Sequence, residues 1–410
     1  MTELPKEFED YTRELFGEEI YSKFIASFDK RLPVSVRLNP FKKGKQFAGV
    51  SVPWCRNGIW LEERPDFTLD PLLHAGCYYV QEAASMFLDE VIRQHVSHPV
   101  TMLDLCAAPG GKSTLARAAL PEGSVLFSNE PDHKRANILM ENIQKQGHTD
   151  VIVTNNYAKD YQKAKLKFDV ILADVPCSGE GMFRKDEGAI REWSIKNVLA
   201  CRDLQRSIIE DIWPCLNDGG LLIYSTCTFN TREDEENVRW IAETLGAEVI
   251  SVDTKAEWHI SGSMLEGFSE PVYRFIPGIT DTEGLFIAVL RKDGKGERNK
   301  PNLKRNNIQK ALRILWDGNP QPIVKGKDRI PPHAEALLFN LGKNKYPQVE
   351  ISLRQALLYL RREAITLDSD TPRGYLIVCF EGHPLGFVKN LGNRANNLYP
   401  QEWRIRKSII

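Results

Sequence analysis

Two cysteines stand at comparable places in the chain, each in a polar loop that follows an apolar run. Cys177 lies in FDVILADVPCSGEGMFRKDE (168–187) and Cys227 in GGLLIYSTCTFNTREDEENV (219–238), while Asp174 ends the first apolar run. A single cysteine at a strand end is more often a small buried apolar residue than a reactive one. Two of them in polar loops beside an acid favour a chemical role, because ligands of open parallel sheets bind at the carboxyl ends of strands.

A thiolate is the strongest common protein nucleophile near neutral pH, and this points to a particular reaction. Carbon 5 of a cytosine is a poor nucleophile until a group adds to carbon 6 and turns the ring into an enamine. Cysteine suits that addition, and a carboxyl such as Asp174 near ring nitrogen N3 would stabilise the charge that develops on the base. After carbon 5 is substituted, loss of its proton and of the cysteine requires a general base or a second group nearby.

The segment LDLCAAPGGKST (103–114) leads from an apolar run into a glycine-rich turn. Its ending, GGKS, is similar to a phosphate-binding loop, but that motif needs a glycine five residues before Gly111, where this chain has Cys106. What remains is a predicted strand over 101–105, a turn of small residues with a proline, and a predicted helix from about Lys112. A cofactor that lies across a strand end beside a helix N-terminus fits this arrangement.

Glu130 ends the next predicted strand, in SNEPD (128–132). An acid at this place in a doubly wound fold accepts hydrogen bonds from ribose hydroxyls, which fits an adenosine-type cofactor. The glycine pattern of dinucleotide-binding folds is absent, so a dinucleotide is not favoured. A lone acid at a strand end is, however, more often a helix N-cap or a solvated side chain.

The elements that must position these residues alternate between strand and helix from about Tyr78 to Leu290. Helical patterns such as HKRANILMENIQKQG (133–147) lie between several predicted strands. Apolar strands joined by crossover helices indicate parallel strands buried on both faces, so the fold class is a doubly wound, Rossmann-like α/β domain. The predicted strands are TMLDL (101–105), SVLFSNE (124–130), DVIVTN (150–155), FDVILADV (168–175), GGLLIYST (219–226) and GLFIAVL (284–290).

Smaller units are predicted on both sides of this domain. Residues 1–72 are expected to form a small N-terminal α+β domain, and residues 73–292 the α/β domain. The stretch 293–307 is rich in Gly, Lys and Asn and is interpreted as a linker. Residues 308–410 then form a C-terminal region, in which a helix pattern is followed by strand and turn signals of a small β-rich module.

Composition restricts the class of protein. Hydrophobic residues make up 42% of the chain and charged residues 27%, as in soluble globular proteins. The N-terminus has no secretory signal pattern and no apolar run reaches membrane-spanning length, so we expect a cytoplasmic protein, with a monomer as the expected state. The eight cysteines contain no C-x-x-C pair and are interpreted as reduced thiols, without structural zinc or another metal.

Charge is distributed unevenly along the chain. Residues 291–410 contain 23 Lys and Arg against 11 Asp and Glu, whereas residues 1–290 contain 31 against 44. A basic C-terminal third favours a module that binds a polyanion, although a solvated basic surface without a partner fits about as well on charge alone. The acidic run from Glu233 to Glu236 is expected in the first turn of a helix, where negative charge suits the helix dipole.

Taken together, the motifs resemble those of the NOL1/NOP2/Sun family of S-adenosylmethionine-dependent RNA cytosine-5 methyltransferases. The resemblance covers the whole predicted α/β domain, from GCYYVQEAASM (76–86) to the strand EGLFIAVLRK (283–292), with the four motifs above in the family's order and spacing. It implies a class I methyltransferase core in which Cys227 is the nucleophile, Cys177 serves release of the methylated product and Asp174 assists. Cytosine-5 DNA methyltransferases attack with the proline-cysteine thiol and lack the second cysteine, so the pair favours RNA.

The resemblance also implies contacts to the cofactor, S-adenosylmethionine. They fall on Cys106, Ala107, Ala108, Pro109, Gly110, Gly111, Lys112, Glu130 and Asp174. A further family acid normally follows the third strand, but this chain has TNNYAKDY (154–161), with Asn155, Asn156 or Tyr157 at that place. That contact is therefore not carried over.

The C-terminal arrangement is similar to the bacterial small-subunit ribosomal RNA methyltransferase F group, whose members append a PUA-like RNA-binding module. The stretch 374–407 carries this likeness, and the basic charge of the region supports it, because neutralisation of phosphates dominates affinity for nucleic acids. The segment SVRLNP (35–40), with Arg37, resembles the family's N-terminal segment beside the RNA path. The expected substrate is structured RNA, 16S rRNA or the small ribosomal subunit. A tRNA methyltransferase of the same family and a ribosome-assembly factor without catalysis are the alternatives.

Overall fold

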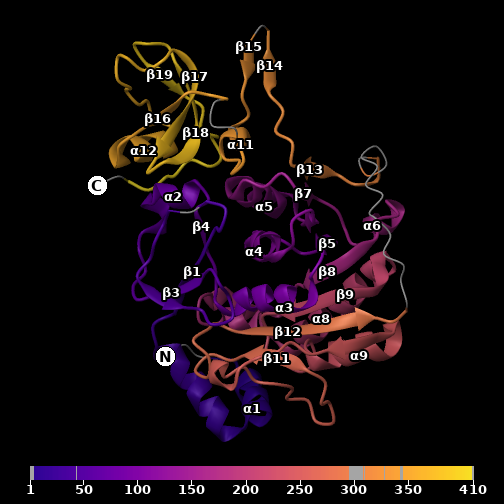
Figure 1. Cartoon of the computed structure of the whole chain (residues 1–410). Coiled ribbons are helices and arrows are strands. Elements are labelled where there is room, and N and C mark those ends of the chain that lie inside the picture. Colours follow the sequence, from indigo (N-terminus) through magenta and orange to yellow (C-terminus); the bar gives the residue numbers. More distant parts are fainter. Residues whose placement is uncertain are drawn as a thin grey trace.

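The computed structural model describes residues 4–42, 44–294, 308, 310–326, 328–341 and 345–408 (Figure 1). The linker predicted over 293–307 lies outside these residues apart from its first two positions. A nine-stranded sheet forms the centre of the molecule, and a small sheet at each end of the chain packs to one side of it (Figure 1).

Five parallel strands form the middle of the central sheet. Hydrogen bonds join them in the order β9-β8-β5-β6-β7, so the chain begins in the middle and extends to both sides. This strand order confirms the predicted doubly wound α/β class. The strands are β5 (Thr101–Asp104), β6 (Val125–Asn129), β7 (Val151–Thr154), β8 (Phe168–Asp174) and β9 (Leu216–Thr226).

The edges of this sheet are antiparallel, which corrects the expectation of parallel strands throughout. The GLFIAVL run lies in β12 (Leu285–Lys292), which is antiparallel to β9, to β10 (Ala247–Ile250) and to β11 (Val272–Phe275). β11 and β12 are joined by a short connection without a helix. A parallel pair of strands needs a long crossover, so β12 runs antiparallel to β11. On the other edge β13 (Ile314–Trp316), from the C-terminal region, pairs antiparallel with β7.

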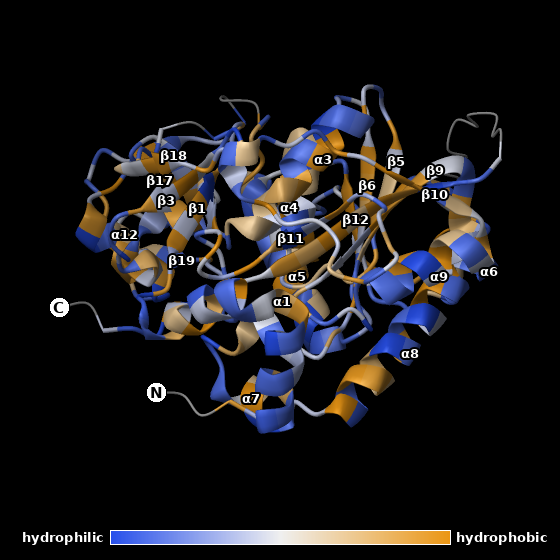
Figure 2. Ribbon diagram, turned by 90° about the horizontal axis from the view of Figure 1, so that it is seen from below, coloured by the Kyte–Doolittle hydropathy of each residue, from blue (hydrophilic) through white to orange (hydrophobic). Residues whose placement is uncertain are grey.

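Helices cover both faces of the sheet, and each face has its own apolar core. Alternate residues of one strand point to opposite faces, so Met102 joins one core and Leu103 the other. Figure 2 shows the apolar strands between helices whose outer faces are polar. None of the helices in the described ranges is long and apolar enough to cross a membrane. The helices are α3 (Leu88–His95), α4 (Gly111–Ala119), α5 (His133–Gln146), α6 (Asp160–Lys163), α7 (Glu187–Glu192), α8 (Ile195–Ile212) and α9 (Glu235–Leu245).

The N-terminal part of the chain reaches the central domain through aromatic packing. Phe8 and Phe24 of α1 pack edge to face against Trp193 and Phe229, the latter two residues after Cys227. A four-stranded sheet follows in the order β2-β3-β1-β4, and its fourth strand comes from beyond residue 72. The elements are α1 (Lys6–Ala26), β1 (Val34–Leu38), β2 (Gly49–Ser51), β3 (Gly58–Leu61), α2 (Pro71–His74) and β4 (Tyr78–Val80).

The C-terminal part forms a second four-stranded sheet, in the order β16-β17-β18-β19, which lies above the N-terminal sheet in Figure 1. The two sheets share one apolar core, in which Val36 and Tyr78 meet Leu360 and Val378. The elements are the hairpin β14 (Ile323–Lys325) and β15 (Asp328–Ile330), then α11 (His333–Ala336), β16 (Gln348–Glu350), α12 (Leu353–Leu360), β17 (Gly374–Phe380), β18 (His383–Asn390) and β19 (Ala395–Asn397).

Candidate active site

The two cysteines singled out in the sequence meet at the carboxyl edge of the central sheet. β8 and β9 are parallel neighbours with Asp174 opposite Ser225, so the loops that follow them begin side by side. Cys227 comes directly after β9, and Cys177 lies three residues beyond β8. Their Sγ atoms are 3.1 Å apart, and both thiols are free and partly buried.

The surroundings of Cys177 keep its thiol protonated. The hydrogen bond to Cys227, burial and the nearby Glu233 carboxylate raise the pKa of Cys177 well above its usual range. Cys177 therefore keeps its proton at neutral pH and can donate it in a hydrogen bond to the Cys227 sulfur. Such a donor stabilises negative charge on Cys227, as attack by that thiolate requires.

Asp174 and Lys112 form an ion pair beside the thiols. Lys112 Nζ lies 2.9 Å from Asp174 Oδ1, which also accepts a 2.7 Å hydrogen bond from the Ser225 hydroxyl. Burial alone would lower the pKa of Lys112, but the Asp174 carboxylate outweighs burial and raises it, so the lysine stays charged. No hydrogen bond within the described part of the chain occupies the other carboxylate oxygen, Oδ2, which leaves it available to a ligand.

The turn from Cys106 to Lys112 joins β5 to α4. Ala107 N–H donates to Asn129 O across the sheet, and Gly110, with φ of 114°, occupies the left-handed N-cap position of α4. A side chain at Gly110 would be strained in that backbone conformation. Burial raises the pKa of the Cys106 thiol, so this side chain is uncharged at neutral pH. The N-terminus of α4 thus opens toward the same sheet edge as the two thiols.

Glu130 follows β6 at the edge of this turn and is 2% exposed. Its Oε1 accepts a hydrogen bond from Asp132 N–H, and its Oε2 is buried without a hydrogen-bond partner among the described residues, with Arg135 Nη1 3.5 Å away. A buried carboxylate oxygen without a donor is costly unless a ligand supplies one. This oxygen therefore fits the ribose hydroxyls of an adenosine-type cofactor.

The stretch after β7 carries two asparagines at the place where the family resemblance implies an acid. Asn156 Nδ2 donates to Arg313 O and its Oδ1 accepts from Arg313 N–H, so this amide holds the segment that leads into β13. Asn155 Nδ2 donates to Glu130 O and Pro131 O. Both asparagines are committed to the protein backbone, and Tyr157 beside them is 66% exposed.

Three acids that the sequence did not mark as site residues are buried near this edge. Asp104, which ends β5, is fully buried, and burial raises its pKa to about 7. Glu180 lies in the Cys177 loop, with its pKa raised to about 7 by burial and by repulsion from Glu233. Glu233 itself was expected in the first turn of a helix, but α9 begins at Glu235, and Glu233 turns inward and is fully buried.

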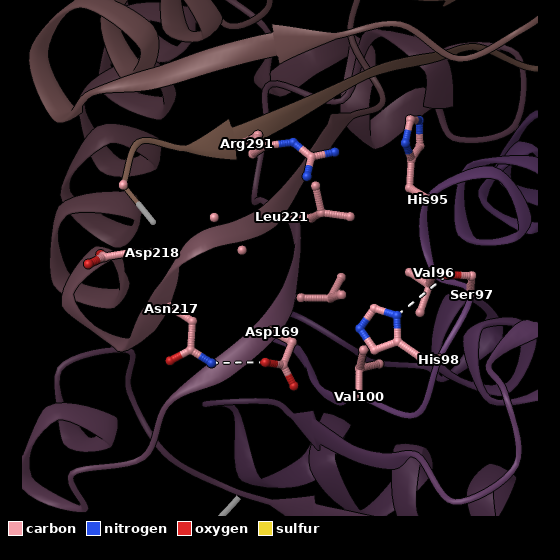
Figure 3. A pocket seen from close by; sticks show the side chains of 14 residues that line it. His95, Val96, Ser97, His98, Val100, Asp169, Asn217, Asp218, Leu221 and Arg291 are labelled. Carbon is pink, nitrogen blue, oxygen red and sulfur yellow. Dashed lines mark hydrogen bonds between the residues drawn. The ribbon is translucent and has the colours of Figure 1, made fainter. Parts of the chain in front are cut away.

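A separate cavity of about 400 Å³ lies at the opposite edge of the sheet, lined among others by His95, His98, Asp169, Asn217 and Arg291 (Figure 3). Asp169 is the second residue of β8, and five residues of strand, about 17 Å, separate it from Asp174 at the other end. This cavity is therefore remote from the thiols. In the described ranges no group of three or more His, Cys, Asp or Glu side chains is placed to hold a metal ion.

The parallel sheet order, the turn before α4 and the acid after β6 define the class of protein: a Rossmann-like methyltransferase. Three family models match the chain. They are 16S rRNA methyltransferase RsmB/F over residues 94–291, the N-terminal domain of 16S rRNA methyltransferase RsmF over residues 4–83, and the methyltransferase RsmF PUA domain over residues 346–405. The chain belongs to the RsmB/F family of RNA methyltransferases, as its motifs led us to expect.

Relatives cover almost the whole chain. Ribosomal RNA small subunit methyltransferase F of Shewanella loihica is 31% identical, over 93% of this chain and 91% of that protein. The protein of the same name from an Enterobacter species is 29% identical, over 97% and 95%. Among solved structures, a methyltransferase homologue from Pyrococcus horikoshii has a TM-score of 0.60 at 26% identity, over 70% of this chain and 95% of that one. NSun6 from the same organism, with SFG, also has a TM-score of 0.60, at 20% identity over 71% and 99%.

Proposed function

We propose that this enzyme transfers a methyl group from S-adenosylmethionine to carbon 5 of a cytidine in 16S rRNA. The observation that carries the proposal is the contact of the two thiols, 3.1 Å apart, at the sheet edge that also holds the turn before α4. Relatives that span more than nine tenths of the chain are named ribosomal RNA small subunit methyltransferases, which supports rRNA over tRNA as the substrate. Because these relatives are bacterial proteins, we infer that the reaction takes place in the cytoplasm.

In this reaction Cys227 attacks carbon 6 of the cytosine, and the carbon 5–carbon 6 double bond supplies the electron pair that makes carbon 5 nucleophilic. This addition places negative charge on the ring, and the Lys112 ammonium, held by Asp174 at 2.9 Å, can stabilise that charge. The target base must leave its stack to reach a sulfur recessed at a sheet edge.

Cys177 is assigned to the second half of the reaction. Once carbon 5 carries the methyl group, its proton must be removed while the bond between carbon 6 and the Cys227 sulfur breaks. Cys177 touches that sulfur and carries a proton, so it can give this proton to the leaving thiolate, and the Cys177 thiolate that results can accept the proton from carbon 5. Without Cys177 the covalent protein–RNA intermediate should persist.

The cofactor would be held by the turn from Cys106 to Lys112, by Glu130 and by Asp174. S-adenosylmethionine supplies an electrophilic methyl group when it is bound. The unpartnered Glu130 Oε2 fits its ribose hydroxyls, and the opening at the N-terminus of α4 fits its methionine carboxylate. The adenine end has no acid from the stretch after β7, because Asn155 and Asn156 bond backbone groups instead.

Substrate affinity is assigned to the C-terminal part of the chain. This region carries the basic excess of the sequence, 23 Lys and Arg against 11 Asp and Glu over residues 291–410, and it contains the match to the PUA domain. Phosphate neutralisation would make binding fall steeply with salt concentration.

Two measurements test the proposal. Bisulfite sequencing of total RNA from cells with and without the gene should show one or more 16S rRNA cytidines that lose methylation, and tRNA sites lost instead would assign the tRNA alternative. In purified enzyme, Cys227→Ala should abolish methyl transfer and leave binding of S-adenosylmethionine in calorimetric titration intact. Full methylation by Cys227→Ala would refute the mechanism, and no cofactor binding by the wild type would favour the assembly factor.

A further inference from the structure

Glu233 holds the backbone on both sides of Cys177, although it comes from the Cys227 loop. Its carboxylate accepts hydrogen bonds from Ser178 N–H at 3.0 Å, from the Ser178 hydroxyl and from Gln205 Nε2 at 2.8 Å. The same Gln205 nitrogen donates to Pro176 O at 2.9 Å. The residues before and after Cys177 are thus fixed through one buried acid.

Glu180 makes the reciprocal connection, from the Cys177 loop to the Cys227 loop. Its Oε2 accepts hydrogen bonds from Phe229 N–H at 2.6 Å and Asn230 N–H at 3.1 Å. Its Oε1 accepts from Trp193 Nε1 and from Asn230 Nδ2, both at 3.0 Å. The backbone that follows Cys227 is therefore held by an acid of the opposite loop.

The two acids also share a donor. Asn230 Nδ2 bonds both Glu180 Oε1 and, at 2.8 Å, Glu233 Oε1. Neither carboxylate forms an ion pair with any residue that the structure describes, and both are almost completely buried. Burial of an acid without a cation is costly. Hydrogen-bond donors on the two loops that carry Cys177 and Cys227, called here the thiol loops, offset this cost, so the conformation of each loop depends on that of the other.

We propose that Glu233 and Glu180 are positioning residues that serve different steps: Glu233 places Cys177 for release of the product, and Glu180 places Cys227 for attack on the base. The inference rests on the proposed function, because it assigns each acid through the step of the thiol that it holds. Such steps are sensitive to displacements of about 1 Å, which can cost about a hundredfold in rate. Groups that fix a reactive side chain therefore influence rate without touching the substrate.

Substitution by glutamine separates the two roles while it preserves volume. Glu233→Gln places an NH₂ group against N–H donors of Ser178 or Gln205, which loosens the Cys177 loop. We expect turnover to fall about tenfold or more and the covalent protein–RNA adduct to accumulate, as in Cys177→Ala. Glu180→Gln loosens the Cys227 loop, so adduct formation in a single turnover should slow by a similar factor without accumulation.

The assay uses the full-length enzyme with 16S rRNA from cells that lack the gene, S-adenosylmethionine and denaturing gels that retain the covalent adduct. Ser178→Ala and Trp193→Phe each remove one donor to one acid and are milder companions should a glutamine variant fail to fold. Ser178→Ala should accumulate the adduct as Glu233→Gln does, and Trp193→Phe should slow adduct formation as Glu180→Gln does, each to a smaller extent. Glu243→Gln, at an exposed acid of α9 without a hydrogen bond or ion pair to either thiol loop among the described residues, is the matched control and should behave as wild type.

The outcomes separate this inference from the proposed function. If wild type methylates and Cys177→Ala traps the adduct, the function stands. The inference is then overturned if Glu233→Gln loses turnover without accumulating adduct, if both acid variants show one signature, or if both keep full turnover. If the wild type does not methylate the RNA and Cys177→Ala does not trap an adduct, the proposed function itself fails.

Discussion

Asp104 should make the stability of this enzyme depend on pH in a way that one substitution removes. The side chain is fully buried at the end of β5, where Oδ2 accepts a hydrogen bond from the Ser113 hydroxyl and Oδ1 has no partner among the described residues. Burial raises its pKa from 3.8 to about 7. Asp104→Asn has nearly the same shape, keeps an acceptor for Ser113 and removes the charge.

The sign and size follow from linkage between protonation and folding. Between about pH 4 and pH 7 the folded protein holds a proton on Asp104 that the unfolded chain releases, so wild-type stability from this group rises as the pH falls. Asparagine carries no such proton. At pH 5, two units below the folded-state pKa, the wild type gains about 3 kcal/mol relative to pH 8, because each unit is about 1.4 kcal/mol.

Denaturant unfolding of both proteins at pH 5 and pH 8 measures this effect. The free energy of unfolding of Asp104→Asn minus that of wild type should be about 3 kcal/mol larger at pH 8 than at pH 5, because only the wild type loses this stability as the pH rises. Other titrating groups are common to both proteins and cancel in the difference. Asp203→Asn, on a carboxylate 64% exposed on α8, is the control and should show the same difference at both pH values. An equal difference at both pH values for Asp104→Asn would refute the reasoning.

Three further substitutions have defined outcomes. Glu130→Ala should raise the dissociation constant for S-adenosylmethionine about tenfold or more in calorimetric titration, because a hydrogen bond to a charged acceptor contributes about 1.5–3 kcal/mol, and an unchanged constant would contradict the ribose assignment. Arg274→Met should lower the free energy of unfolding by about 3–5 kcal/mol in urea, because it leaves the buried Asp234 and Glu235 carboxylates without their cation; a neutral effect would contradict this. Leu360→Ala should lower the free energy of unfolding by about 2–5 kcal/mol, because Leu360 lies in the core shared by the N-terminal and C-terminal sheets. The affinity for S-adenosylmethionine should not change, and an altered affinity would contradict the view that this core is separate from the cofactor site.

The meeting of Cys177 and Cys227 could be anticipated because strand ends are readable from apolar runs. Two buried strands that follow one another through a helix place their carboxyl ends at one edge of a parallel sheet. The sequence therefore predicted the edge, the turn at Cys106 and the acid at Glu130. The 3.1 Å between the two sulfurs depends on loop conformation, which apolar periodicity does not determine.

The features that escaped prediction depend on contacts between distant segments. The direction of β12 is set by a connection without a helix, and β13 joins the sheet from beyond the predicted domain boundary. Glu233 lies in an acidic run and Glu180 between two glycines, and neither pattern indicates burial, because their hydrogen-bond donors come from distant segments such as Gln205 of α8 and Phe229 after Cys227. For Glu180, its place three residues after Cys177 was the one available clue.

Covalent capture by the Cys177→Ala variant tests the central claim most directly. The variant is incubated with S-adenosylmethionine and 16S rRNA from cells that lack the gene, digested, and the linked peptide is identified by mass spectrometry. We expect a peptide that contains Cys227, bonded through its sulfur to a cytosine that carries a methyl group. A variant that forms no adduct, or an adduct that persists when Cys227 is also replaced by alanine, would contradict the assignment of the two thiols.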